Sequence, residues 1–270
     1  MNADASGALM KGRRGLVMGV ANDHSIAWGI ASQLAAQGAE LAFTYQGAAF
    51  GKRVEPLAQS VGSSLVLPCD VEDTATVDKV FERLGNEWGK IDFIVHAIAY
   101  SDKEELKGRY ADTTRDNFIR TLVISCFSFT ELVRRAADLM PDGGSALTLT
   151  YGGSTKVMPN YNVMGVAKAA LESSVRYLAS DYGGNGIRVN AISAGPMRTL
   201  AGAGITGARA MYAFQKQHSP LRRTVSLEDV GGSALYLLSP LSSGVTGEVH
   251  YVDAGYNIIS TPRPEDLNGD

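Results

Sequence analysis

Short apolar runs rich in β-branched residues recur along the chain, separated by segments of a few tens of residues. Several runs are apolar at every position, which is typical of strands that are buried on both faces of a parallel sheet. We therefore expect seven such strands. The runs are LVMGV from Leu16, ELAFTY from Glu40, SLVLPC from Ser64, IDFIVHAI from Ile91, SALTLTY from Ser145, IRVNAIS from Ile187 and EVHYVD from Glu248.

The segments between these runs carry apolar residues at helical spacing. Ile26, Ile30 and Leu34 follow one another at intervals of four, and a second stripe runs from Val77 to Trp88. Such stripes indicate helices that pack one face on the sheet. The alternation of strand and helix predicts a doubly wound, Rossmann-like α/β fold, with a seven-stranded parallel sheet and helices on both faces.

The composition is that of one globular domain. The chain has 270 residues, of which 45% are apolar, 20% are charged and 30 are glycines, as expected of an α/β protein with many tight turns. No repeat, low-complexity tract or proline-rich linker divides it. We expect a single domain over residues 12–260 and flexible termini at residues 1–11 and 261–270. Cys69 and Cys126 lie in apolar runs, which favours buried thiols over a disulfide.

The charge pattern excludes some partners and suggests another. The net charge of −3 gives no reason to expect nucleic acid, and no uninterrupted apolar stretch is long enough to span a membrane. We expect a cytoplasmic protein without a metal site. Residues 182–227 contain no Asp or Glu, yet they hold six basic residues: Arg188, Arg198, Arg209, Lys216, Arg222 and Arg223.

The first predicted strand is followed by the turn GVANDHSIAWG, residues 19–29. In doubly wound folds this turn brings backbone amides close to a ligand phosphate. The segment does not match the usual glycine pattern, but Gly19 can supply the sharp exit from the strand and Gly29 can let the helix lie close to the sheet. Ser25 suits an N-cap or a hydrogen-bond donor to phosphate. A purely structural turn is the alternative.

The ends of the second and third predicted strands carry polar side chains. Gln46 occupies the position that contacts the adenine ribose in this fold. It offers no charge to a 2′-phosphate, which favours NAD over NADP, and the nearest cations, Lys52 and Arg53, lie further along the chain. Asp70 and Val71 follow the third strand, where adenine would lie. The alternative for Asp70 is the N-cap of the next helix.

Tyr161 and Lys168 are the strongest candidates for catalysis. They are seven residues apart, two helical turns, and share a face if residues 160–182 are helical. Pro159 marks where that helix can begin. A phenol beside an ammonium is favoured as phenolate and is strengthened as a hydrogen-bond donor. Lys156 has no such partner, and we expect it to be solvated.

The order of elements resembles that of the short-chain dehydrogenases, but their catalytic tyrosine and lysine are four residues apart. The position four residues after Tyr161 is Gly165; Tyr212 and Lys216 have the spacing, but they follow the sixth strand and are interpreted as a coincidence. The wider spacing resembles the bacterial NADH-dependent enoyl-acyl-carrier-protein reductases over residues 12–256. The phrases ELAFTYQ, PNYNVMGVAK, IRVNAISAGPMRTLA and RRTVSLEDVG carry the same resemblance.

This resemblance implies that NADH reduces the trans-2 double bond of an enoyl group on acyl carrier protein, in fatty-acid elongation. Hydride would reach the β-carbon, Tyr161 would donate a hydrogen bond to the enolate oxygen, and Lys168 would hold the nicotinamide ribose. Tyr151 matches the second tyrosine of the family and would border the thioester. Two roles stay open for it: delivery of a proton to the α-carbon, or only a wall of the pocket.

Further positions follow from the same resemblance. Ser101 would lie beside the substrate, and residues 197–220 would form a mobile lid over the acyl chain. The basic residues around this segment would attract the acidic carrier protein, unless they are solvated or paired elsewhere in the fold. A homotetramer is also implied. Besides Gly19, Ser25, Gln46, Asp70, Val71 and Lys168, the expected cofactor contacts are Ile26, Ile98, Ala194, Gly195, Met197 and Thr199.

Two other functions are compatible with parts of the sequence. A short-chain dehydrogenase for a ketone or alcohol would require a tyrosine and a lysine four apart after the fifth strand, where the chain has none. A non-catalytic dinucleotide sensor would keep Gly19, Ser25 and Gln46. Such a sensor has no need of Tyr161 and Lys168 on one helical face.

Overall fold

One parallel sheet of seven strands organises the molecule. The computed structural model describes residues 9–200 and 207–261. All pairings between neighbouring strands are parallel, in the order β3-β2-β1-β4-β5-β6-β7. Each apolar run contains one strand, so the predicted sheet is confirmed. The strands are β1 (Arg14–Met18), β2 (Glu40–Tyr45), β3 (Leu65–Pro68), β4 (Phe93–His96), β5 (Gly144–Thr150), β6 (Ile187–Ala194) and β7 (Val249–Val252).

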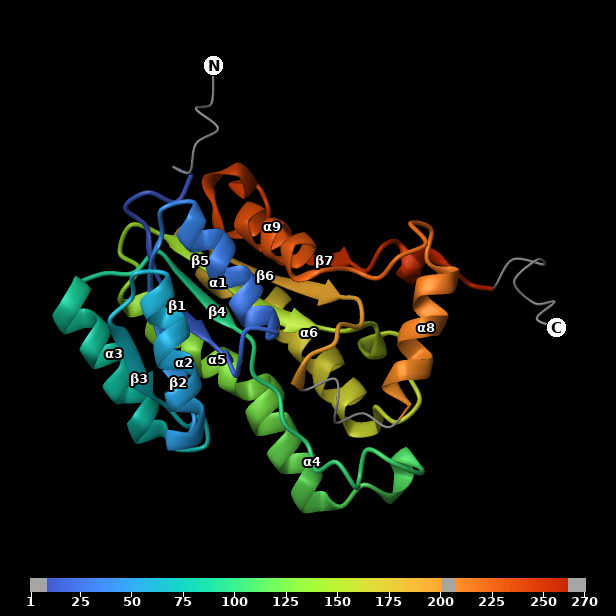
Figure 1. The fold of residues 1–270 in the computed structure, drawn as a ribbon. Coiled ribbons are helices and arrows are strands. Elements are labelled where there is room, and N and C mark those ends of the chain that lie inside the picture. The colour runs from blue at the N-terminus through green and yellow to red at the C-terminus, as the bar shows by residue number, and fades with distance from the viewer. Residues whose placement is uncertain (1–8, 201–206, 262–270) are drawn as a thin grey trace.

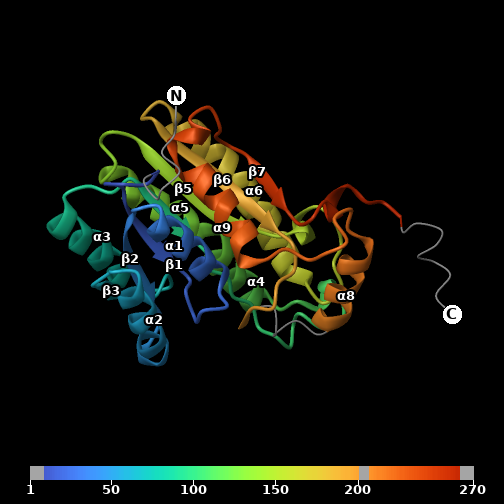
Figure 2. The same ribbon diagram turned by 45° about the horizontal axis from the view of Figure 1, so that its top comes forward.

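Helices cover both faces of the sheet, as the alternation predicted (Figures 1 and 2). One face packs against α1 (Ile26–Ala36), α2 (Ala48–Ser60) and α9 (Leu227–Leu238). The other packs against α3 (Thr74–Trp88), α5 (Ser128–Asp138) and α6 (Asn162–Gly183). In β1, Val17 packs on the face covered by α1, α2 and α9, whereas Leu16 and Met18 pack on the face covered by α3, α5 and α6. Successive side chains of a strand point to opposite faces of the sheet.

The remaining elements lie around the carboxyl ends of the strands. The helix α4 (Arg115–Leu122) continues through the π-helix η2 (Val123–Phe127) into α5, while α8 (Ala208–His218) stands apart from the sheet layers beside the end of β6 (Figure 1). The connections within the described residues include the short 3-10 helices η1 (Tyr110–Asp112), η3 (Gly152–Ser154), η4 (Pro240–Ser242) and η5 (Tyr256–Ile258).

Two glycines of the first strand-to-helix unit have distinct roles. Gly19 adopts a φ of +100°, and a Cβ there would lie 2.1 Å from the carbonyl oxygen of Ala97, so the turn needs glycine as expected. Gly29 does not serve the predicted contact with the sheet. A Cβ at Gly29 would lie 2.8 Å from Cβ of Leu227, the first residue of α9. Gly29 therefore lets α1 approach α9, the neighbouring helix on the same face.

The amino-terminal boundary lies earlier than the sequence predicted. Met10 is fully buried, and its amide donates to the carbonyl of Gln37 at 2.9 Å. The domain thus includes Met10, and the predicted start at residue 12 is too late. The rest of the expected flexible termini, residues 1–8 and 262–270, and part of the expected lid, residues 201–206, lie outside the described residues.

The structure also describes the two cysteines and the distribution of possible metal ligands and long helices. Cys69 and Cys126 are both buried free thiols, as their apolar surroundings predicted. Residues 9–200 and 207–261 contain no cluster of His, Cys, Asp and Glu suited to a metal ion. Of the helices described, none has the length and apolar character needed to cross a bilayer.

Candidate active site

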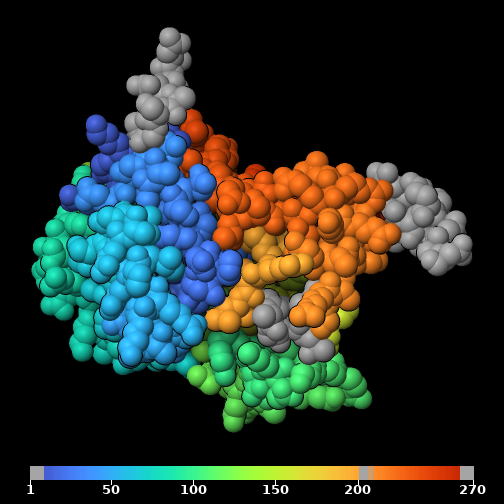
Figure 3. Space-filling model, viewed as in Figure 1, coloured from blue at the N-terminus to red at the C-terminus, as the bar shows by residue number. Residues whose placement is uncertain are grey.

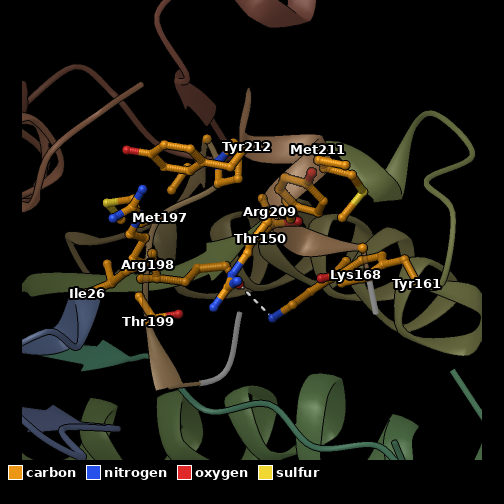
Figure 4. A pocket seen from close by; sticks show the side chains of 17 residues that line it. Ile26, Thr150, Tyr161, Lys168, Met197, Arg198, Thr199, Arg209, Met211 and Tyr212 are labelled. Atoms are coloured by element: carbon orange, nitrogen blue, oxygen red, sulfur yellow. Dashed lines mark hydrogen bonds between the residues drawn. The ribbon is translucent and has the colours of Figure 1, made fainter. Parts of the chain in front are cut away.

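A large cavity lies where β5 and β6 end, between α6, α8 and the start of α1. Its volume is about 1210 Å³, and its mouth is visible as a hollow beside α8 in Figure 3. Figure 4 shows its side chains: Tyr161 and Lys168 enter from α6, opposite Ile26 and Thr199, with Met211 and Tyr212 of α8 closing another side. The lining also includes Leu149, Thr150, Tyr151, Ala194, Gly195, Pro196, Met197, Arg198, Gly207, Arg209 and Ala210.

The helix that carries Tyr161 and Lys168 forms where the sequence predicted. It spans residues 162–183, with Tyr161 at its N-cap. Asn160 and Asn162 adopt φ values of +58° and +37°, so the chain turns sharply just before the helix; asparagine tolerates this left-handed region better than most residues. The turn places Tyr161 over the cavity, and the seven-residue spacing places Lys168 in the same cavity, so that only 8% and 6% of the two side chains are exposed.

Lys168 is a buried ammonium with one strong partner in the protein. Its Nζ donates to the carbonyl of Leu149, in β5, at 2.7 Å. Burial disfavours the charged form and lowers the pKa of Lys168 to about 8. An ammonium has three N–H donors, so the bond to Leu149 leaves donors for a ligand in the cavity.

Tyr161 is protonated to a greater degree than the sequence interpretation suggested. Burial raises the pKa of its phenol well above the ordinary value, and Tyr151 and Glu172 raise it further. The expected effect of the Lys168 ammonium, which would favour phenolate, is not among the causes of this shift. Tyr161 is thus a neutral phenol at physiological pH and is suited to donate a hydrogen bond.

Tyr151 lies against Tyr161, edge to face, with 5.2 Å between the ring centroids. Nε2 of Gln215, in α8, lies 3.4 Å from the Tyr151 hydroxyl, and burial raises the pKa of this phenol too. The two tyrosines and Lys168 line one cavity. They come from β5 and α6, which the sequence had placed at the correct edge of the sheet.

Two glycines, Gly153 and Gly165, allow this packing. A Cβ at Gly153 would lie 2.5 Å from the Tyr161 ring, and one at Gly165 would lie 2.7 Å from the carbonyl oxygen of Gly153. Gly165 occupies the position of the short-chain-dehydrogenase lysine. A side chain there would collide with the backbone of η3, so the departure from that signature is a consequence of close packing.

The segment after β6 forms the opposite wall, as expected. Ala194, Gly195, Met197 and Thr199 all line the cavity, together with Ile26 of α1. A Cβ at Gly195 would lie 3.1 Å from Cα of Asp253, so the turn also packs closely against the segment after β7. The predicted cofactor positions of α1 and this segment are therefore brought together.

Ser25 occupies the N-cap of α1 but does not cap the helix with its side chain. Its hydroxyl accepts from the amides of Ala21 and Asn22, each at 3.0 Å, and donates to Oδ1 of Asn22 at 3.2 Å. The predicted N-cap bond is thus wrong. Ser25 instead holds the preceding turn in shape, because its oxygen is directed toward the backbone of residues 21 and 22.

Gln46 and Asp70 lie side by side at the ends of β2 and β3, outside the lining of the large cavity. Nε2 of Gln46 donates to Oδ2 of Asp70 at 3.0 Å, and the other carboxylate oxygen accepts from the amide of Glu72. The alternative role of Asp70 as a helix N-cap is wrong, because Asp73 caps α3 by accepting from Ala75. Val71, beside Asp70, is largely buried.

Ser101 and Ile98 follow β4, and neither lines the large cavity. Ile98 packs against the core on the α5 and α6 side. The buried Ser101 hydroxyl accepts from Thr121 at 3.0 Å and bonds to Asn117, so its own partners lie in α4. This orientation anchors the loop to α4, and the expected position of Ser101 beside the substrate stays a prediction.

The basic residues of the acid-free segment divide into structural and exposed groups. The guanidinium of Arg188 donates to the carbonyls of Leu237 and Ser239, and Arg223 pairs with Asp229. These two are structural. Arg198 and Arg209 line the cavity, and the guanidinium carbon of Arg198 lies 5.1 Å from the centre of the Tyr212 ring; the sequence did not single out this contact.

Two further positions correct or complete the sequence interpretation. Lys156 is exposed, as expected, and its Nζ also donates to the carbonyl of Asn257 at 2.6 Å, which ties the segment after η3 to η5. Tyr212 lines the cavity, but its hydroxyl accepts from Thr224 at 2.7 Å. Lys216 lies on the exposed surface of α8 and not in the cavity lining, so the spacing of Tyr212 and Lys216 does not form a catalytic pair.

Known proteins match this chain over almost its full length. A family model described as "Enoyl-(Acyl carrier protein) reductase" matches residues 19–257. The Enoyl-[acyl-carrier-protein] reductase [NADH] 2 of Rhizobium meliloti (strain 1021) is 73% identical over 259 residues, which cover 96% of this chain and 97% of that protein.

Solved structures give the same result. The crystal structure of FabI from Candidatus Liberibacter asiaticus superposes with a TM-score of 0.93 at 64% identity, over 95% of this chain and 99% of that one. The enoyl-(acyl-carrier-protein) reductase of Anaplasma phagocytophilum, in complex with NAD, has a TM-score of 0.93 at 56% identity, over 95% and 98%. The chain belongs to the enoyl-acyl-carrier-protein reductase family.

Proposed function

We infer that this protein uses NADH to reduce the trans-2 double bond of enoyl groups carried by acyl carrier protein, in fatty-acid synthesis. One observation supports the position of the active site in this fold. Tyr161 and Lys168, two helical turns apart, line one cavity together with residues 194–199. In this proposal, the wall formed by residues 194–199 holds the cofactor and faces Tyr161, the hydrogen-bond donor to the substrate.

The carboxyl edge of the sheet fits a dinucleotide. Gly19 leaves no room for a side chain in the first turn, Gln46 and Asp70 offer an amide and a carboxylate, and Ile26 and Thr199 border the cavity. We propose that Gln46, Asp70, Val71 and Ile98 hold the adenosine part of NADH. The residues proposed for the remainder are Gly19, Ser25, Ile26, Lys168, Ala194, Gly195, Met197 and Thr199.

Bound NADH supplies the hydride that is added to the β-carbon of the substrate. The protein's own side chains orient the cofactor and stabilise the negative charge that develops on the substrate. Lys168 binds the nicotinamide ribose hydroxyls with donors that its bond to Leu149 leaves available. Tyr161, kept neutral by burial, donates to the thioester oxygen, where negative charge develops as the enolate forms.

Tyr151 borders the same oxygen in this proposal. Its ring packs on Tyr161, and its hydroxyl has only a long contact to Gln215. We propose that Tyr151 shapes the substrate end of the cavity and orients Tyr161. We assign no proton transfer to it, because its raised pKa and its contact with Gln215 do not connect it to a source of protons in the described residues.

We propose that the exposed basic residues of α8 guide the carrier protein to the cavity. Arg209 is exposed at the rim, and Lys216 is exposed two turns along the same helix. Acyl carrier proteins are acidic, so this surface accelerates their encounter by long-range attraction. The lid predicted at residues 197–220 and the cytoplasmic location stay predictions.

A homotetramer is also proposed, on the basis of two separate exposed apolar surfaces. Soluble monomers rarely leave large contiguous apolar surface in water, and two different two-fold interfaces build a tetramer. The first surface follows α4, η2 and α6 and includes Phe118, Ile119, Phe127, Val166 and Tyr177; the second follows α9, η4 and β7 and includes Tyr236, Leu241 and Tyr251.

The reaction can be followed directly. Purified protein is mixed with NADH and a crotonyl thioester, and the loss of absorbance of the reduced nicotinamide is recorded. We expect oxidation that depends on the enoyl thioester, and weaker activity with NADPH because Gln46 carries no charge. Oxidation with ketones and none with any enoyl thioester would contradict the proposal.

A further inference from the structure

Glu172 is a buried carboxylate close to Lys168, and the mechanism above gives it no role. It lies in α6, four residues after Lys168, and only 7% of its surface is exposed. The hydroxyl of Thr150, a residue of the cavity lining, donates to its Oε1 at 2.6 Å. This short hydrogen bond fixes the position of the carboxyl group beside the cavity.

The end of β5 holds two charged side chains of α6, Lys168 and Glu172. The carbonyl of Leu149 accepts from Lys168, and the next residue, Thr150, donates to Glu172. Residues four apart in a helix lie on the same face, one turn from each other. Two consecutive strand residues therefore fix a cation and an anion one helical turn apart, both away from water.

We propose that Glu172 is a positioning residue: its buried carboxylate, held by Thr150, keeps Lys168 in its cationic form and so maintains the donors that bind the cofactor ribose. This inference rests on the function proposed above, in which Lys168 binds the cofactor ribose. A buried ammonium is unstable unless an opposite charge or a hydrogen bond compensates it. Glu172 opposes the effect of burial on the pKa of Lys168, and without it the ammonium would lose its proton nearer to neutral pH.

Other titratable groups also face Lys168. The pKa of the Cys126 thiol, in η2, is raised by burial, and the pKa of His96, in β4, is lowered by burial to about 3. Tyr151 and Tyr161 are phenols with raised pKa values. Cys126 and Glu172 both oppose the effect of burial on the pKa of Lys168, and Cys126 has the larger effect. Of these groups, Glu172 is the carboxylate.

The test is the pH dependence of NADH binding to the full chain, followed by fluorescence titration from about pH 6 to pH 9.5. In the wild type we expect affinity to fall as Lys168 loses its proton, near pH 8. Glu172→Gln keeps the shape and an acceptor for Thr150 but removes the charge. We expect its midpoint to move down by roughly one pH unit, with little loss of affinity at the acid end.

Two variants separate charge from packing. Glu172→Asp retains the charge and should recover most of the wild-type midpoint. Asp181→Asn makes the same change of net charge at an exposed position of the same helix, thirteen residues from Lys168, and should leave the midpoint unchanged. If Glu172→Gln does not fold, Thr150→Val keeps the carboxylate but releases it, and should shift the midpoint in the same direction by less.

The outcomes distinguish this inference from the proposed function. An unchanged midpoint in both Glu172→Gln and Thr150→Val, or an equal loss of NADH affinity at every pH, would overturn the role of Glu172 while enoyl reduction by the wild type stands. A wild type that binds NADH with the expected midpoint but reduces no enoyl thioester would refute the function, and a lower midpoint in Glu172→Gln would still support the role of Glu172.

Discussion

The cavity has two walls that use charge in opposite ways. The α6 wall buries Lys168 and Glu172 and satisfies each from consecutive residues of β5. The α8 wall leaves Arg209 and Lys216 exposed. Buried charges act over short range and are little screened, whereas exposed charges act at a distance and weaken with salt. The comparison teaches that substitutions in the first wall should alter the chemical step and cofactor binding, and those in the second should alter the encounter with the carrier protein.

Tyr161→Phe should have the largest effect and tests the α6 wall. Loss of one donor to a developing oxyanion costs on the order of 3 kcal/mol, so turnover should fall roughly a hundredfold or more. NADH affinity should change little, because the phenol is assigned to the substrate. Steady-state rates with a crotonyl thioester measure this effect. Tyr177→Phe, on the exposed surface of the same helix, is the control; wild-type turnover in Tyr161→Phe would remove Tyr161 from the mechanism.

The second prediction concerns the stability of the folded protein in acid, which depends on the buried side chain of His96. His96 bonds to Thr148 and Ser128, each at 2.9 Å, and its pKa is lowered from 6.5 to about 3. Below pH 6.5 His96 takes up a proton in the unfolded chain but stays neutral in the folded protein. The free energy of unfolding therefore falls as the pH is lowered. We expect a loss of about 2 kcal/mol in the free energy of unfolding between about pH 6.5 and pH 5.

Denaturant unfolding at several pH values measures this loss. His96→Gln should flatten the dependence over that interval, although the variant starts from lower stability. His24→Gln, at an exposed histidine, should leave the slope as it is in the wild type. Equal slopes in all three proteins would show that His96 is protonated in the folded state.

Reversal of charge on α8 tests the other wall. The double variant Arg209→Glu, Lys216→Glu should raise KM for a carrier-linked substrate by roughly tenfold at low salt, since electrostatic steering changes encounter rates by at least that factor. KM for a coenzyme A thioester should change much less, and added salt should reduce the difference. Equal effects on both substrates would refute steering by this surface.

The smallest effect is expected for Tyr151→Phe. The ring that packs on Tyr161 is kept, and only the contact to Gln215 is lost, at 3.4 Å a weak hydrogen bond. Turnover should fall by roughly threefold or less, since a net hydrogen bond is worth about 1 kcal/mol. A solvent isotope effect equal to that of the wild type would agree with a structural role. A loss of a hundredfold would instead identify Tyr151 as a proton donor.

Much of the fold and part of the site could be predicted from the sequence, because they depend on local periodicity. All seven strands overlap the predicted apolar runs, and α6 differs from its predicted bounds by only one or two residues. The spacing of Tyr161 and Lys168 then followed from helix geometry. Gly19 was recognisable because a strand exit at the first turn needs a residue that tolerates positive φ.

Other interpretations failed where several partners were possible. Arg188 belonged to the acid-free segment by composition, but it is half-buried and donates to carbonyls near the end of α9. Ser25 bonds backward to its turn and not forward into α1. Gly29 faces Leu227 of α9, and not the sheet. In each case the packing of the folded chain decided which of the possible partners lay within reach.

The sequence by itself determined the doubly wound fold, the family resemblance and the ranking of Tyr161 and Lys168, because strand and helix periods and short-range spacing are local properties. Only the tertiary structure decided the protonation of these groups and their neighbours. Burial, which no local pattern reports, makes Tyr161 a neutral donor and lowers the pKa of Lys168. The pairing of Glu172 with Thr150 joins positions 22 residues apart, and it exists because α6 packs against the end of β5.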